Sequence, residues 1–124
     1  MPMLIADIHH VSLNVTETGR ALGFYRDLLG LAELERPAFS FGGAWLDAGN
    51  GRQIHLIEST SVPADVGQHV AFAVSDLDGA IEVLRAAGCD VSDAKSVGGT
   101  AARQAFVLDP DGNRVELHQP AAVE

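Results

Sequence analysis

The sequence predicts an α+β fold made of two tandem βαβββ modules, each with a curled mixed sheet. Each half of the chain opens with a strand of alternating apolar residues, continues with an amphipathic helix that ends at a glycine, and closes with three short extended segments. In each half a turn sequence joins the last two segments, AGNG (48–51) and DPDG (109–112). We expect a single domain over 1–124, consisting of module 1–58, linker 59–67 and module 68–124.

The first module shows this order of elements. In IHHVSLNV (8–15) apolar and polar residues alternate, which is typical of a strand with one apolar face. TETGRALGFYRDLLG (16–30) repeats apolar residues at helical spacing; Thr16 can cap its start, and Gly30 suits the left-handed position after a helix. Three extended segments are expected next, at 31–35, at about 39–47 and at 52–58.

The second module repeats the same plan. QHVAFAVS (68–75) alternates in the same way, and SDLDGAIEVLRAAG (75–88) begins with a Ser-x-x-Asp cap and ends in a glycine. Further extended segments are expected near 89–92, 102–108 and 113–118. Aligning the two modules residue by residue pairs His10 with His69, Trp45 with Phe106 and His55 with Glu116.

Composition and charge limit the classes of partner. The chain carries a formal charge of −9, and a field of that sign repels nucleic acid and anionic membranes. A small-molecule or protein partner is favoured instead. Cys89 is the single cysteine, which excludes an intrachain disulfide and a cysteine-rich zinc site. The sequence shows neither a secretory signal nor an apolar stretch near the roughly 18 residues of a membrane span. A cytoplasmic location is therefore expected.

Four polar residues occupy equivalent positions in the two modules. His10 and His69 belong to the first strands, and His55 and Glu116 to the last ones, each on the face opposite the apolar residues. Three imidazoles and one carboxylate suit a divalent transition metal such as Zn, Ni, Co, Mn or Fe. A single histidine on a strand is more often a hydrogen-bonded, half-buried residue, and that interpretation stays open. His118, two residues after Glu116, could replace or assist one ligand.

Two further residues are candidates for contact with a small-molecule substrate. Arg103 could hold a carboxylate or a carbonyl through two guanidinium nitrogens, or could pair with an acidic neighbour instead. Trp45 could line the pocket together with Phe39 and Phe41, and core packing explains these aromatic residues equally well.

Several stretches of the chain resemble signatures of the vicinal oxygen chelate superfamily, namely HHVSLNV, GFYRDLLGL, HVAFAVSDLDGAIEVLRAAG and DPDGNRVEL. This superfamily includes glyoxalase I, extradiol dioxygenases and the bleomycin- and fosfomycin-resistance proteins. The resemblance covers nearly the whole chain. It implies a glyoxalase-like fold, with paired βαβββ units around a metal-centred cavity and metal ligands at His10, His55, His69 and Glu116. In such sites the metal chelates two neighbouring substrate oxygens and stabilises an enolate or oxyanion.

The resemblance implies more than one chemistry. The first expectation is a metal-dependent lyase or isomerase of the glyoxalase I type, acting on a small α-hydroxy carbonyl compound, with Glu116 as ligand and catalytic base. Glyoxalase I usually has a carboxylate where this chain has His55, so glutathione need not be part of the substrate. The alternatives are an extradiol-type dioxygenase with iron on His10, His69 and Glu116, a thiol transferase of the fosfomycin type, and a metal-independent drug-binding protein of the bleomycin-resistance type.

The resemblance also implies an oligomeric state. Short chains of paired modules in this superfamily commonly dimerise, so a homodimer is expected. Residues of both chains can then complete the cavity. The sequence leaves open whether the four ligands come from one chain or from two.

Overall fold

The computed structural model of the chain describes residues 3–122. The chain divides into two compact units, unit 1 (Met1–Ser61) and unit 2 (Val62–Glu124). The boundary falls inside the expected linker 59–67. Each unit holds one four-stranded sheet and a helical segment.

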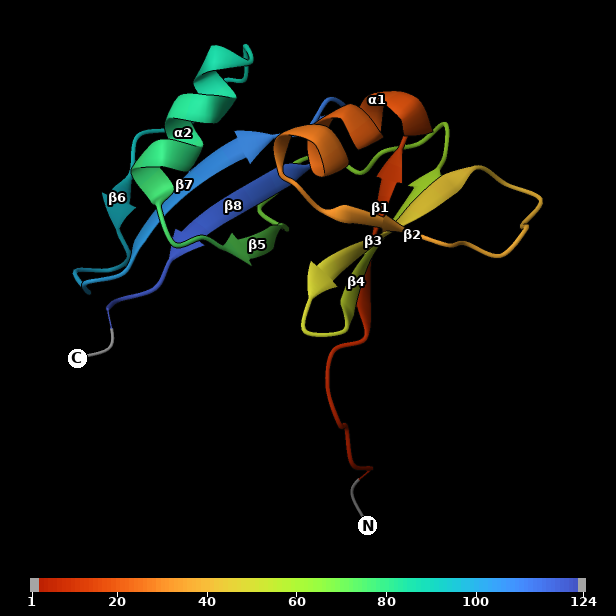
Figure 1. The fold of residues 1–124 in the computed structure, drawn as a ribbon, viewed down its shortest axis with the longest axis horizontal. Coiled ribbons are helices and arrows are strands. Elements are labelled where there is room, and N and C mark those ends of the chain that lie inside the picture. Colours follow the sequence, from red (N-terminus) through yellow and green to blue (C-terminus); the bar gives the residue numbers. More distant parts are fainter. Residues whose placement is uncertain (1–2, 123–124) are drawn as a thin grey trace. The chain divides into compact units, whose positions relative to one another are not determined.

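Unit 1 is a mixed sheet with a helical segment packed on it (Figure 1). Its elements are β1 (His10–Val15), α1 (Thr18–Leu22), η1 (Gly23–Leu28), β2 (Ala32–Leu34), β3 (Gly43–Gly49) and β4 (Arg52–Glu58). The strands lie in the order β1-β4-β3-β2, with β1 parallel to β4 and the other neighbours antiparallel. Helix α1 runs directly into η1, a π-helical segment, which widens the last turns before the chain leaves for β2.

Unit 2 has the same topology (Figure 1). Its elements are β5 (Val70–Ala73), α2 (Leu77–Ala86), β6 (Lys95–Ser96), β7 (Arg103–Leu108) and β8 (Arg114–Gln119). The strand order is β5-β8-β7-β6, again with the first and last strands parallel and the other neighbours antiparallel. The predicted α+β fold of two βαβββ modules is confirmed.

Both helix starts differ in detail from the expectation. The cap of α1 is Glu17 rather than Thr16, because the Glu17 carboxylate accepts hydrogen bonds from two free amides, those of Gly19 at 2.8 Å and Arg20 at 3.0 Å. The cap of α2 is Asp76, whose carboxylate accepts from the Gly79 amide at 3.0 Å. In both places a carboxylate next to the expected residue closes the first turn.

Two strands also differ from the expected ranges. The segment expected at about 39–47 begins only at Gly43, where φ is +156°, so residues 39–42 belong to the loop before β3. The segment expected near 89–92 makes a single bridge, from Val91 to Val107, and the paired strand β6 lies further on.

Each sheet turns its apolar face toward its own helix. Helix α1 packs on β3 and β4, and α2 packs on β7 and β8. The buried apolar residues of unit 1 include Val15, Tyr25, Leu46, Ile54 and Leu56, and those of unit 2 include Leu77, Leu84, Val107, Val115 and Leu117. Among the described residues, no helix has the length and apolar character that a membrane crossing requires.

Candidate functional site

The alternation of strand side chains places the predicted ligands on the face of each sheet that its helix does not cover. This face is the open face of the sheet. In β8, Val115 and Leu117 are almost fully buried under α2, so Glu116 between them points to the other face. In β4, Ile54 and Leu56 are buried in the same way, and His55 takes the opposite direction. His55 and Glu116, which the alignment of the two modules pairs, therefore occupy equivalent positions in the last strand of each sheet.

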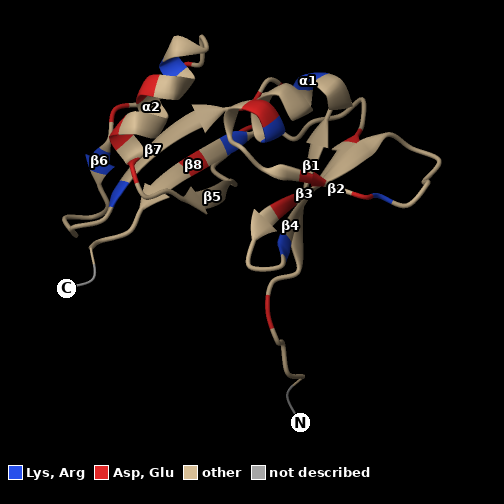
Figure 2. Cartoon of the chain, viewed as in Figure 1, with Lys and Arg blue, Asp and Glu red and all other residues tan. Residues whose placement is uncertain are grey.

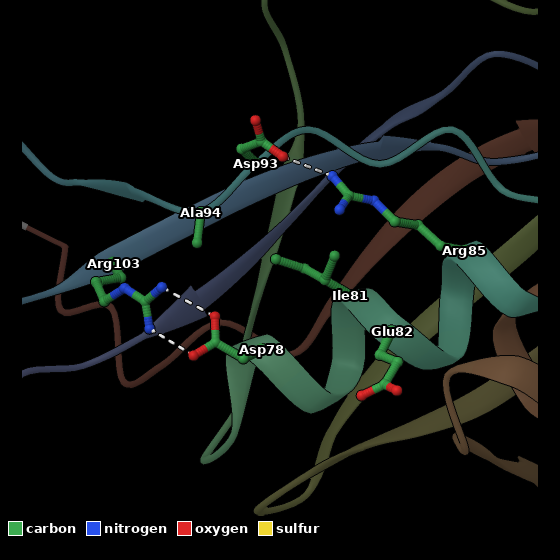
Figure 3. Close-up of a pocket in the computed structure, with 7 residues that line it drawn as sticks. All are labelled: Asp78, Ile81, Glu82, Arg85, Asp93, Ala94 and Arg103. Atoms are coloured by element: carbon green, nitrogen blue, oxygen red, sulfur yellow. Dashed lines mark hydrogen bonds and ion pairs between the residues drawn. The ribbon is translucent and has the colours of Figure 1, made fainter.

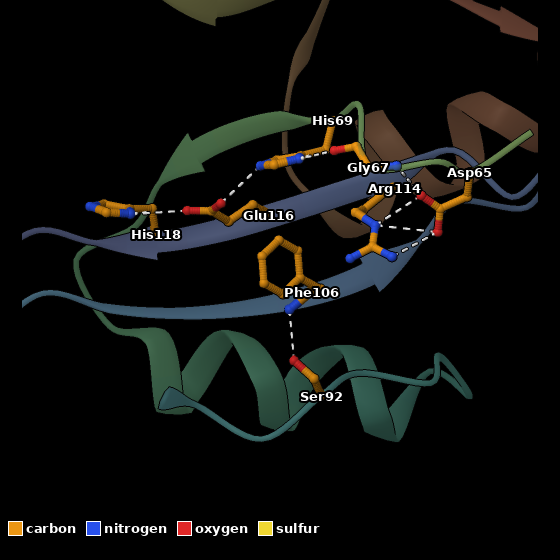
Figure 4. Close-up of polar contacts among 8 residues, drawn as sticks. All are labelled: Asp65, Gly67, His69, Ser92, Phe106, Arg114, Glu116 and His118. Carbon is orange, nitrogen blue, oxygen red and sulfur yellow. Dashed lines mark hydrogen bonds and ion pairs between the residues drawn. The ribbon is translucent and has the colours of Figure 1, made fainter. Parts of the chain in front are cut away.

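In unit 2 a buried carboxylate lies between two imidazoles (Figure 4). Glu116 is 7% exposed. Its Oε1 lies 3.0 Å from Nε2 of His69, and its Oε2 lies 3.0 Å from Nδ1 of His118. Since an ionised carboxylate only accepts hydrogen bonds, the His118 ring donates through Nδ1–H. Both oxygens of Glu116 are thus held by side chains of the same open face.

The orientation of His69 is fixed by a second contact. Its Nδ1 lies 2.8 Å from the carbonyl oxygen of Gly67, which can only accept, so this nitrogen carries a proton. In the neutral ring Nε2 then presents a lone pair toward Glu116 Oε1. Two acceptors 3.0 Å apart attract each other only if a proton lies between them, on the ring or on the carboxyl group, or if both atoms bind one cation. A backbone carbonyl on the far nitrogen is the usual support of a metal-binding histidine.

Other side chains hold the surroundings of Glu116 in place (Figure 4). The ring of Phe106, the neighbour of Glu116 in β7, meets the His69 ring edge to face at 5.5 Å. The Arg114 guanidinium lies over the same Phe106 ring and pairs with Asp65, with Nη2 at 2.9 Å from Oδ2. The hydrogen bond from Arg114 lowers the pKa of the Asp65 carboxyl from its ordinary value. This ion pair ties the segment before β5 to β8.

In unit 1 the two predicted histidines belong to a stack of flat rings. His55 is 8% exposed; one face of its ring lies against His10 with centroids 3.9 Å apart, and the Trp45 indole stacks on it at 4.2 Å. Its Nε2 lies 2.8 Å from the amide oxygen of Gln53. Burial, followed by the positive fields of His10, His9 and Arg36, lowers the pKa of His55 from 6.5. The ring therefore favours the neutral form that a metal requires.

The donor types of the predicted ligands, imidazole nitrogen and carboxylate oxygen, are those that a divalent transition metal accepts. Among the described residues, no group of three or more His, Cys, Asp or Glu side chains is arranged to hold a metal ion, and the four predicted ligands lie two in each unit. Within unit 2, the 3.0 Å between His69 Nε2 and Glu116 Oε1 suits two ligand atoms about 2.1 Å from one ion at roughly a right angle. Neutral imidazole and carboxylate together are the donors that zinc, nickel, cobalt, manganese and iron accept.

The two residues predicted to contact substrate lie in different surroundings. Trp45 shares a face with His55 and stacks on it. Arg103 lies on the opposite face of its sheet from Glu116, together with the buried Ala105 and Val107. The structure therefore brings Trp45, but not Arg103, together with a predicted ligand.

Arg103 pairs instead with Asp78 of α2 (Figure 3), with Nη2 2.9 Å from Oδ1 and Nη1 3.2 Å from Oδ2. Asp78 is thus the acidic neighbour expected as the alternative partner of Arg103. The hydrogen bond lowers the pKa of Asp78. The pair lies at a surface pocket of about 390 Å³ between α2 and the chain before β6, which Arg85 and Asp93 also line.

Three residues of the open faces were not singled out from the sequence. Gln53 contacts His55, Gln104 lies opposite His118 in the register of β7 and β8, and the Gly67 carbonyl orients His69. Gln53 and Gln104 could have been found, because each lies two residues from a position already placed on the open face. The role of Gly67 depends on how the linker bends, and no side-chain pattern indicates it.

Comparison with known proteins identifies the family. A family model described as the Glyoxalase/Bleomycin resistance protein/Dioxygenase superfamily matches residues 7–117. The chain belongs to this superfamily, which confirms the resemblance inferred from its motifs.

Individual relatives and solved structures are 27% to 33% identical to the chain. It is 30% identical to the metallothiol transferase FosB of Staphylococcus haemolyticus over 129 residues, covering 93% of the chain and 84% of the relative. It is 33% identical to the lactoylglutathione lyase of Haemophilus influenzae over 121 residues, covering 89% and 90%. A glyoxalase family protein from Bacillus anthracis superposes with a TM-score of 0.83 at 27% identity, covering 96% and 98%. Both named relatives are enzymes.

Proposed function

We propose that the chain is a metal-dependent enzyme of the lyase or isomerase type, acting on a small α-hydroxy carbonyl compound or a similar substrate with two neighbouring oxygens. The observation that carries the proposal is the buried Glu116 carboxylate, held between His69 and His118 on the open face of its sheet. Membership of the superfamily and the similarity to a lactoylglutathione lyase support it.

In this proposal His10, His55, His69 and Glu116 hold the metal. When bound, a divalent metal polarises the substrate oxygens and stabilises the negative charge that develops on them. The similarity to a metallothiol transferase supports metal dependence, since that relative's name states it. Zinc, nickel, cobalt, manganese and iron are all compatible with three imidazoles and a carboxylate.

The chain's own residues supply positioning and proton transfer. Glu116 takes the proton from the carbon next to the substrate carbonyl, acting as general base. His118 donates a hydrogen bond to Oε2 and so holds the carboxylate in one rotamer. The Gly67 carbonyl keeps the Nε2 of His69 directed at the same place. Trp45 covers His55 and offers a flat apolar surface to the substrate.

A metal-dependent thiol transferase is the second candidate, and the similarity to FosB favours it. Such an enzyme needs the same donors to activate an electrophile, but no general base at a carbon. The two candidates therefore differ in what Glu116 does. Under the first it removes a carbon-bound proton, and under the second it acts only as a ligand.

We also expect a homodimer, in which the ligand pairs of unit 1 and unit 2 come together within one chain or between two. Sedimentation velocity measures this directly. Mixing a chain that carries His55→Ala with one that carries Glu116→Gln tells the two arrangements apart. Restored metal binding in the mixture requires ligands from both chains in one site.

The experiment that tests the function combines metal analysis with two assays. Purified protein is loaded with Zn, Ni, Co, Mn or Fe, and the bound metal is measured alongside Glu116→Gln and the exposed control Asp93→Asn. Hydroxyacetone in D₂O is then followed by proton NMR, and a small epoxide mixed with cysteine is followed by loss of free thiol. Metal-dependent deuterium exchange that Glu116→Gln abolishes supports the lyase or isomerase. Thiol loss without exchange supports the transferase, and the absence of metal binding rejects both.

A further inference from the structure

The ring stack of unit 1 extends from the predicted ligand His55 out to the surface. Trp45 lies parallel to His55, at 4° and 4.2 Å between centroids. Phe39 follows at 6.1 Å from Trp45, and Phe41 stacks on Phe39 at 5.1 Å and 14°. Phe39 and Phe41 are 45% and 46% exposed. The loop before β3 thus presents two half-exposed rings next to Trp45, with the Phe39 ring tilted by 49° against the indole.

A single cation accompanies these rings. The Arg36 guanidinium carbon lies 4.8 Å from the centre of Phe39 and 5.1 Å from that of Phe41, and Nη2 donates to the Phe41 carbonyl at 2.8 Å. These contacts hold the side chain in place without neutralising it. Within the described residues Arg36 makes no ion pair, whereas Arg26, Arg52, Arg85, Arg103 and Arg114 each contact a carboxylate.

An unneutralised guanidinium is unusual on a chain with 17 acidic and 8 basic side chains. Figure 2 shows how few the basic positions are beside the acidic ones in each unit. Guanidinium groups bind carboxylates through paired hydrogen bonds, and flat apolar rings bind other flat rings by stacking. Arg36 therefore complements a negative group, and Phe39 and Trp45 complement the planar body that carries it.

We infer that Arg36, Phe39 and Trp45 form a subsite for an aromatic carboxylate, placed beside His55. The occupant is a small molecule because the charged and planar groups meet within one short loop and one strand. A second copy of the chain seated on these rings is the competing occupant, and the dissociation of the dimer by Phe39→Leu tests for it. Only the role of the subsite rests on the proposed function. In that role the subsite binds the aromatic anion of a substrate and so selects substrates whose two neighbouring oxygens then reach the metal.

The single tryptophan of the chain makes the subsite directly observable. Trp45 gives the one indole N–H signal in a ¹⁵N-labelled protein. The probe is 2-naphthoate, titrated in the presence of EDTA so that no metal takes part. Its controls are 2-naphthylmethanol, which has the ring without the charge, and cyclohexanecarboxylate, which has the charge without the ring. We expect 2-naphthoate to shift the Trp45 signal and to bind more tightly than either control.

Substitutions separate the two parts of the subsite. Arg36→Gln is expected to weaken 2-naphthoate about tenfold and 2-naphthylmethanol less than about twofold, because only the charge-assisted contact is lost. Phe39→Leu is expected to weaken both about fivefold. The matched control is Arg52→Gln, which removes an arginine of unit 1 that pairs with Asp7, and it leaves both affinities unchanged. Thermal unfolding of each variant shows that its fold is retained.

The outcomes separate this inference from the proposed function. Naphthoate binding that Arg36→Gln weakens, in a protein that binds no metal, supports the subsite and rejects the metal chemistry. Metal binding without a Trp45 shift, or with equal shifts in the wild type and Arg36→Gln, overturns the subsite alone. A dimer that Phe39→Leu dissociates, together with no naphthoate binding, also overturns it, because the rings then form an interface between copies.

Discussion

His69 Nε2 and Glu116 Oε1 face each other at 3.0 Å, although 46 residues separate them in the sequence. The parallel pairing of β5 with β8 brings these positions together, because Ala71 lies beside Glu116 in the register. His69 is two residues before Ala71, so its side chain points to the same face. The Gly67 carbonyl holds the only proton of the neutral His69 ring on the far nitrogen. The pair is thus placed to share a proton or a cation, and the proposal that it holds a metal has consequences that can be tested.

Glu116→Gln should remove metal binding while the fold stays intact. The glutamine amide can accept from His118 Nδ1–H through its oxygen and donate to the His69 lone pair through its nitrogen, so no buried polar atom loses its partner. We expect the free energy of unfolding to change by less than about 1 kcal/mol, and the metal dissociation constant to rise at least about 100-fold. Calorimetric metal titration and urea denaturation measure the two quantities. A variant that keeps its metal affinity would show that Glu116 is no ligand.

His118→Gln should act on the same site more weakly. His118 holds Oε2 of Glu116 and is not one of the four proposed ligands, so the loss of its ring is expected to loosen the carboxylate. Supports of this kind typically change metal affinity by about 10- to 100-fold, and we expect an effect in that range. The metal dissociation constants of His118→Gln and Glu116→Gln are measured in the same series of calorimetric titrations. An effect of His118→Gln as large as that of Glu116→Gln would mean that His118 itself binds the metal.

The order of elements and the hairpins β3–β4 and β7–β8 were predictable from the sequence because they depend on local patterns, whereas the parallel pairing of the first strand with the last was not predicted. Alternating apolar residues mark the strands, and the turns at 48–51 and 109–112 fix which strands are neighbours. The same alternation placed His55 and Glu116 on the open faces, since a residue between two buried neighbours must point the other way. These predictions needed no knowledge of distant contacts.

The side-chain partners were not predictable in the same way. Arg103 was a candidate for substrate contact, yet its alternation with Ala105 and Val107 puts it beside Asp78 of α2. That distinction needs the register of β7, and residue patterns place the ends of a strand only to within about two to four residues. The position of Arg36 over Phe39 depends on the path of the loop before β3, and loop paths leave no periodic signal.

The pKa of His55 should lie below the ordinary value of 6.5. Burial between His10 and Trp45 disfavours the charged ring, and the positive fields of His10 and His9 add to this. A histidine whose pKa is lowered by folding lowers the stability of the metal-free protein as the pH falls through about 6.5, because only the unfolded chain takes up the proton freely. Histidine ring signals in NMR measure the pKa, and urea denaturation at pH 7.5 and 5.5 measures the stability. His10→Gln should raise the His55 pKa; a pKa above 6.5 in the wild type would contradict the stacked arrangement.

Two leucines of unit 2 should differ sharply in their contribution to stability. Leu117 is 2% exposed under α2, so Leu117→Ala leaves a cavity and should lower the free energy of unfolding by about 2–4 kcal/mol. Leu108, at the end of β7, is 51% exposed, so Leu108→Ala should cost less than about 0.5 kcal/mol. Urea denaturation of both variants gives the two values with one method. Since Leu117 adjoins Glu116, the buried face of β8 also fixes the direction of the carboxylate. Equal losses in the two variants would mean that β8 does not turn Leu117 toward the helix, and the placement of Glu116 on the open face would fail with it.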